Sequence, residues 1–199
     1  FAVGNDFAVC KKKEAKNDYE GACESCLKVE KKSPDFCDSR QTLREIYRNS
    51  LKQYEKALSA QWEYIQTGRC INTYTDYIVM FELASKAKMR KIPKNLRDPN
   101  QVISFFGEAK DMIILQVQRE DRLNMENSLK QFTSAYTVKL IEFMIDAAES
   151  EMSSDRAEEY EQDATMLYGY LKDRFIKDLP SGIRGQYLDK ATTFIRKIK

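Results

Sequence analysis

The sequence predicts an all-α protein, an irregular antiparallel bundle of six or seven helices with a disulfide-pinned N-terminal segment. Apolar residues recur every three or four positions through almost the whole chain, and no segment alternates apolar and polar residues over the length of a strand. Only four prolines and seven glycines interrupt the 199 residues. Because a chain of this length can bury one substantial core, we expect a single all-helical domain over residues 1–199.

The longest predicted helix runs from Ser39 to Gln66. Its apolar stripe comprises Leu43, Ile46, Tyr47, Leu51, Tyr54, Leu58, Trp62 and Ile65. Gly68 stands just beyond it, where helices commonly stop. A straight helix over residues 39–66 would be about 42 Å long, at roughly 1.5 Å per residue. We expect the cysteine-rich segment, residues 1–37, to pack against this helix.

The remaining helices are delimited by prolines, glycines and capping residues. Asp98–Pro99 places an N-cap before a proline at the first helical position, and Ser153-Ser154-Asp155 is a second start signal. The expected helices run from about Thr73 to Lys91, from Pro99 to about Val117, from about Leu129 to Met152, from Ser154 to Phe175, and, after Pro180-Ser181-Gly182, from Ile183 to Ile198.

All five cysteines, namely Cys10, Cys23, Cys26, Cys37 and Cys70, lie in the first 70 residues. In a secreted chain they predict two disulfides and one unpaired cysteine, while the first four could instead hold a structural zinc in a reducing compartment. A disulfide needs Cα atoms within about 7 Å, so a continuous 39–66 helix excludes a Cys37–Cys70 bridge. We therefore expect Cys37 to lie near Cys23 or Cys26, and Cys10 to approach Cys70.

The chain contains no histidine. Ser-His-Asp and Cys-His nucleophile systems are therefore excluded, as are the Glu-x-x-His di-iron and His-x-x-x-His zinc sites found on helices. Nucleotide-binding glycine motifs and the aspartate-rich calcium loop are also missing from the sequence. We expect a protein that is not an enzyme, with no catalytic residue, no cofactor and no resident metal.

Charge is distributed unevenly although the net charge is only +2, a value that does not call for a nucleic acid partner. No apolar run approaches the roughly 18 residues of a membrane span. Between residues 85 and 97 there is no acid, and there are six basic residues: Lys86, Lys88, Arg90, Lys91, Lys94 and Arg97. Within this patch, the stretch from Ala87 to Ile92 fits the loose basic spacing of glycosaminoglycan-binding segments. The basic residues could equally be cations that a helix C-terminus favours. Residues 142–163 are strongly acidic and are either solvated or face a basic partner.

The chain begins at Phe1 without an initiator methionine. Together with the clustered cysteines, this start predicts a removed signal peptide and an extracellular, secreted protein. The Cys10–Cys37 cluster and a helical body rich in Lys, Glu and Tyr resemble small salivary proteins of blood-feeding insects, of the mosquito neutrophil-stimulating factor type. The resemblance is one of general character over the whole chain. It implies a protein delivered into host skin that modulates immune cells or haemostasis.

Three kinds of function stay open on these grounds. The first is a secreted binding protein that contacts a host protein or cell-surface receptor, with a glycosaminoglycan as a further partner. The second is a carrier that encloses a small apolar ligand between its helices. The third is an intracellular helical adaptor with a Cys₄ zinc site. The sequence sets neither the partner nor the oligomeric state.

Overall fold

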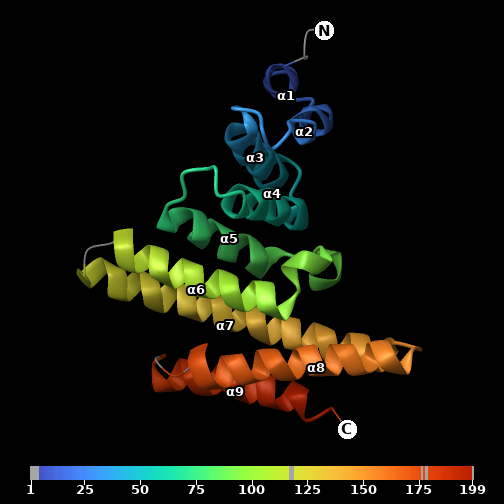
Figure 1. The fold of residues 1–199 in the computed structure, drawn as a ribbon, viewed down its shortest axis with the longest axis vertical. Coiled ribbons are helices and arrows are strands. Elements are labelled where there is room, and N and C mark those ends of the chain that lie inside the picture. The colour runs from blue at the N-terminus through green and yellow to red at the C-terminus, as the bar shows by residue number, and fades with distance from the viewer. Residues whose placement is uncertain (1–4, 117–118, 176, 178, 199) are drawn as a thin grey trace. The chain divides into compact units, whose positions relative to one another are not determined.

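The computed structural model describes residues 5–116, 119–175, 177 and 179–198. The described residues form helices joined by turns and short links and include no strand, so the all-α prediction is confirmed (Figure 1). The α-helices are α1 (Asp6–Glu14), α2 (Tyr19–Leu27), α3 (Phe36–Glu45), α4 (Tyr54–Gln66), α5 (Tyr74–Lys86), α6 (Pro99–Gln116), α7 (Arg119–Ser150), α8 (Ser154–Tyr170) and α9 (Ser181–Ile195). Single turns of other helix types are η1 (Ile46–Ser50), η2 (Met89–Lys91), η3 (Lys94–Leu96) and η4 (Leu171–Phe175).

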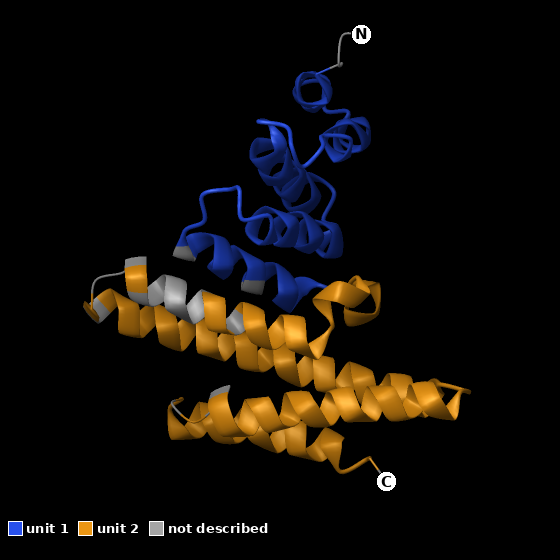
Figure 2. Cartoon of the chain, viewed as in Figure 1, with its two compact units in different colours: residues 1–87 blue, residues 88–199 orange. Residues whose placement is uncertain are grey.

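The chain forms two compact units, residues 1–87 and residues 88–199 (Figure 2). The sequence pattern predicts a single domain over residues 1–199, because the apolar periodicity does not change character at residue 87. Each unit has its own buried side chains and is described by itself. None of the helices in the described residues is both long and apolar enough to cross a membrane.

In the first unit, each of the helices α1 to α5 packs on the next along the chain. The core lies between α3, η1, α4 and α5. Its largest fully buried side chains are Phe36, Leu43, Ile46, Leu58 and Leu83. The cysteine-rich segment therefore packs, through α2, on α3 and η1.

The predicted continuous helix from Ser39 to Gln66 is wrong. Helix α3 passes into a wide π turn in which the Leu51 N–H donates to the Ile46 carbonyl at 3.0 Å. Lys52 then adopts a left-handed conformation with φ 53°, and α4 begins at Tyr54 and packs back against α3. Asn49 and Ser50 favour such a break because they have low helix propensity. The apolar stripe runs across the break because both arms of the hairpin bury their apolar faces.

Arg40 joins three segments of the first unit. Its side chain is buried, and its guanidinium lies over the Phe36 ring at 4.4 Å. It donates to the Cys26 carbonyl at 3.0 Å and to the Val29 carbonyl at 3.3 Å, and it pairs with Glu63 of α4. A buried guanidinium is tolerated when its donors are satisfied. Arg40 gives the Cys26 carbonyl a second donor beside the Val29 N–H, which lies at 3.2 Å, and it also bonds the Val29 carbonyl.

The second unit is built around α7, against which α6, α8 and α9 all pack. Its largest fully buried side chains are Ile92, Leu140, Ile141, Ile145, Leu167 and Leu171. Helix α7 begins at Arg119, ten residues before the predicted start at Leu129. The pattern missed this part because residues 119–128 contain only two apolar side chains, Leu123 and Met125, and so show no apolar stripe. Asp98 caps α6 as predicted, its Oδ1 accepting from the Asn100 N–H at 2.8 Å. Helix α8 begins at Ser154, also as predicted.

The helix predicted from Thr73 to Lys91 is shorter than expected. Its start is as predicted: the Thr73 N–H donates to Asp76 Oδ2 at 2.8 Å, and α5 begins at Tyr74. It ends at Lys86, after which the backbone of Ala87 is extended. The basic residues beyond it lie in η2, η3 and extended links, so they are not one helix face.

Candidate functional site

Four of the five candidate cysteines form disulfides. Cys10 of α1 is bonded to Cys26 of α2, with their Cα atoms 5.3 Å apart, and Cys37 of α3 is bonded to Cys70, with Cα atoms 5.6 Å apart. The predicted neighbours are therefore wrong, and the excluded Cys37–Cys70 pair is the one that forms. The physical reason is the break at Leu51–Gln53, which folds α4 back so that its far end returns to the start of α3.

Cys23 is the unpaired cysteine, and its thiol is buried. Burial raises the pKa of the Cys23 thiol, although a hydrogen bond with Tyr47 and the charge of Lys56 act in the opposite direction. A reactive cysteine needs an accessible thiolate. The position of Cys23 is therefore that of a small core side chain.

The cysteines do not form a zinc site. The four thiols of the hypothetical Cys₄ set include Cys10, Cys26 and Cys37, which are all oxidised in disulfides. Among the described residues, no group of three or more Cys, Asp or Glu side chains is placed to hold a metal ion. The N-terminal cysteines therefore act as covalent links between helices.

The six basic residues of the 86–97 segment do not share one environment. Lys86 belongs to the first unit, where it pairs with Glu82 at 3.1 Å. Four of the others lie in the second unit and are exposed; we call them the basic segment: Lys88, Arg90, Lys91 and Lys94. Arg97 is half-buried, with its guanidinium 4.7 Å from the centre of the Phe143 ring.

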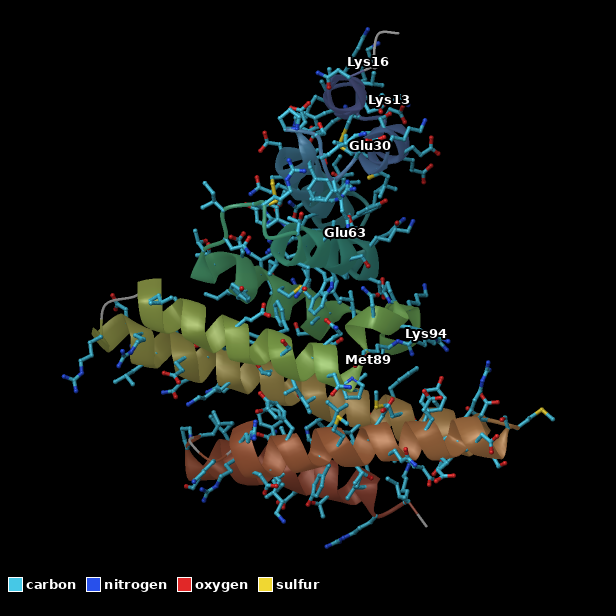
Figure 3. All side chains as sticks on the ribbon, in the orientation of Figure 1. Lys13, Lys16, Glu30, Glu63, Met89 and Lys94 are labelled. Atoms are coloured by element: carbon cyan, nitrogen blue, oxygen red, sulfur yellow. A yellow bond between two sulfur atoms is a disulfide. The ribbon has the colours of Figure 1, made fainter. Side chains whose placement is uncertain are left out.

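Buried neighbours hold the basic segment at the surface. Ile92 and Leu96 are 1% and 2% exposed, and they fix the two short turns onto the helices of the second unit. The Tyr136 hydroxyl of α7 donates to the Leu96 carbonyl at 2.8 Å. Lys94 lies between these two apolar residues and points outward in Figure 3, and Arg90 and Lys91, which precede Ile92, are exposed. The segment is thus an exposed cationic surface with a fixed backbone.

A cavity of about 380 Å³ lies within the second unit. Its walls come from η3 and the start of α6, from α7 and from α8. The lining residues are Lys94, Arg97, Asp98, Pro99, Asn100, Phe143, Met144, Arg156, Glu159, Tyr160 and Asp163. Three cationic and three anionic side chains therefore face one space, which also has an aromatic wall.

On the acidic side of this cavity, Asp163 lies near two other carboxylates. Burial raises the pKa of Asp163, and the neighbouring carboxylates of Glu159 and Asp98 raise it further. Both neighbouring carboxylates disfavour ionisation of Asp163, because like charges repel. A positively charged group at this point would relieve the repulsion.

The sequence contained only part of the signal for this cavity. Asp98 was recognisable as an N-cap, and Lys94 and Arg97 as members of the basic residues. Arg156, Glu159 and Asp163 recur at the spacing of one helix face, but this pattern is also typical of a solvated face. That Phe143 and Met144 of α7 lie opposite that face depends on tertiary packing, which no local pattern contains.

The cavity does not resemble that of an apolar carrier, because such sites are lined predominantly by hydrophobic side chains. A second cavity, in the first unit, is also lined in part by charged residues, including Asp6, Lys28, Glu30, Lys32 and Asp35.

Comparisons of the chain with protein-family models, with curated proteins and with solved structures each returned no match.

Proposed function

We propose that this chain is a secreted, non-enzymatic binding protein that acts through protein–protein contacts on a host protein or cell-surface receptor. The kind of role it suits is that of a salivary effector that modulates host immune cells or haemostasis. The observation that carries the proposal is the pair of disulfides in the first unit, since structural disulfides persist in oxidising, extracellular compartments.

The basic segment supplies a contact surface. Lys88, Arg90, Lys91 and Lys94 are exposed within a stretch that contains no acid, and buried Ile92 and Leu96 keep its backbone in place. Fixed cations attract anionic partners and raise the rate of encounter, an effect that salt screens. Sulfated glycosaminoglycans on cell surfaces are partners of this chemistry, and binding to them would hold the protein near its receptor.

The test measures saturable binding of the labelled, oxidised protein to leukocytes, to endothelial cells and to immobilised heparin. One variant replaces Arg90, Lys91 and Lys94 by glutamine. The control replaces three exposed basic residues of the same unit by glutamine: Lys172, Arg174 and Lys190. Both variants carry the same change in net charge.

We expect the 90/91/94 variant to lose at least tenfold in heparin affinity and the control to stay within twofold. Equal losses in both variants would show that only net charge matters and would refute a role for the basic segment. The broader proposal of a cell-acting protein is refuted if the unmodified protein shows no saturable binding to either cell type and captures no plasma protein.

A further inference from the structure

The cavity of the second unit carries opposite charges that do not pair with each other. Its cationic side chains are Lys94, Arg97 and Arg156, and its anionic side chains are Asp98, Glu159 and Asp163. Among the interactions of the described residues, no ion pair joins any of these six groups to another charged side chain. Charges of both signs are therefore available to a ligand inside one small space.

The anionic side is suited to an ammonium group. Asp163 is half-buried on α8, and its carboxylate lies close enough to those of Glu159 and Asp98 to be repelled by both. Oδ1 of Asp98 already accepts the N–H groups of Asn100 and Gln101 at the start of α6. Asp163 is thus the carboxylate that is both sheltered and without a hydrogen-bond donor among the described residues.

The cationic side is suited to a carboxylate. Arg97 rests on the Phe143 ring, and its Nε–H is buried without a hydrogen-bond acceptor among the described residues. A ligand carboxylate in the cavity would give the Arg97 guanidinium a charged acceptor. Arg156 and Lys94 add positive charge at the same cavity.

The walls and size of the cavity narrow the ligand further. A volume of about 380 Å³ is that of a small-molecule site, and Phe143, Met144 and Tyr160 offer apolar and aromatic surface. An apolar ligand would leave charges of both signs unpaired. A phosphate would face three carboxylates, and the first N–H groups of α6 are already occupied by Asp98. A simple cation would leave Arg97 without an acceptor.

We propose that this cavity binds a small zwitterion, the size of a free amino acid or a dipeptide, with its ammonium group at Asp163 and its carboxylate at Arg97. The apolar part of the ligand lies against Phe143 and Tyr160. This site is separate in chemistry from the macromolecular contact proposed above, although Lys94 belongs to both surfaces.

The experiment is isothermal titration calorimetry on the full, oxidised chain with three matched probes. Phenylalanine carries both charges, phenethylamine only the ammonium group, and 3-phenylpropionate only the carboxylate; the Gly-Phe dipeptide extends the series. We expect the better of phenylalanine and Gly-Phe to bind at least tenfold more tightly than either singly charged probe. Equal affinity for a singly charged probe, or no saturable binding of any zwitterion, would overturn the proposal.

Two variants assign the ends of the ligand. Asp163→Asn is expected to weaken zwitterion binding at least tenfold while leaving 3-phenylpropionate binding within twofold. Arg97→Gln is expected to weaken zwitterion binding at least tenfold while leaving phenethylamine binding within twofold. Matched controls remove the same charges outside the cavity: Glu158→Gln on α8 and Arg196→Gln after α9, both at exposed positions. Equal losses in variants and controls would contradict the site. Circular dichroism shows whether each variant is folded. If Arg97→Gln does not fold, the probe selectivity of Asp163→Asn alone supports or overturns the proposed site.

Discussion

Replacing Arg40 by methionine is expected to destabilise the first unit far more than neutralising its ion-pair partner Glu63. Methionine preserves much of the apolar stem of the side chain but removes every donor of the guanidinium. The buried carbonyls of Cys26 and Val29 then lose their bonds from the guanidinium at 3.0 and 3.3 Å, and the Cys26 carbonyl keeps only the Val29 N–H at 3.2 Å. Glu63 loses its partner as well, but its side chain is 43% exposed and water can solvate it.

The size of the effect follows from these bonds. A hydrogen bond to a charged donor contributes about 1.5–3 kcal/mol, so two of them amount to roughly 3–6 kcal/mol. Removing a buried charge returns part of this, because the guanidinium no longer has to be desolvated. We therefore expect Arg40→Met to cost about 3 kcal/mol. Glu63→Gln keeps an acceptor oxygen and loses only a partly exposed ion pair, which is worth about 0–1 kcal/mol.

The single tryptophan makes the measurement specific. Trp62 is buried in α4, so its fluorescence reports unfolding of the first unit and not of the second. Urea titration of the oxidised protein gives the midpoint, and a loss of 3 kcal/mol lowers it by roughly 1–3 M for a slope of about 1–3 kcal/mol/M. The reasoning is refuted if Arg40→Met costs less than about 1 kcal/mol, or if Glu63→Gln costs as much as Arg40→Met.

Three further predictions concern the cysteines and the cavity. Replacing both Cys37 and Cys70 by serine should destabilise the first unit by about 4 kcal/mol, since the bridge closes a loop with a sequence separation of 33; urea unfolding followed by Trp62 fluorescence checks this. Cys23 should not react with a thiol reagent in the native protein and should react as one thiol per chain in denaturant; rapid labelling of the native protein would contradict its burial. Asp163→Asn should raise stability at pH 7 by less than about 1 kcal/mol. The pKa of the Asp163 carboxyl is higher in the folded than in the unfolded chain, so the wild-type protein loses stability as pH rises through the unfolded and then the folded pKa. Thermal unfolding measures the gain, which should vanish at pH 3, where this carboxyl is protonated in both states.

The sequence was sufficient for the fold class and for several helix ends, such as the starts of α5, α6 and α8, because these depend on local signals. Apolar periodicity and the capping residues Asp98 and Ser153 act within one or two turns of chain. The cysteine pairing failed for a different reason. It followed from a helix assumed to be continuous, and the break at Lys52 carries neither glycine nor proline to announce it. A left-handed residue that is not glycine is uncommon, and here tertiary contacts of both hairpin arms hold it in place.

The cavity shows the same limit at the level of the site. Its charged residues lie on segments more than 50 positions apart, from Lys94 to Asp163, and each group has an ordinary local explanation. Only the packing of α6 and α8 on α7 brings them to one space. Sequence patterns could therefore indicate which residues are polar on each helix, but not that these cations and anions line one cavity together with Phe143.

The buried thiol of Cys23 has a consequence for how the disulfide pattern survives once it has formed. Cys23 lies one helical turn from Cys26, so a thiolate there would be near enough to attack the Cys10–Cys26 bridge and release Cys10. Such exchange needs an ionised, accessible sulfur, and burial disfavours the thiolate. Folding thus removes the internal nucleophile that would otherwise scramble the bridges. The core that the bridges stabilise therefore also prevents Cys23 from exchanging with them.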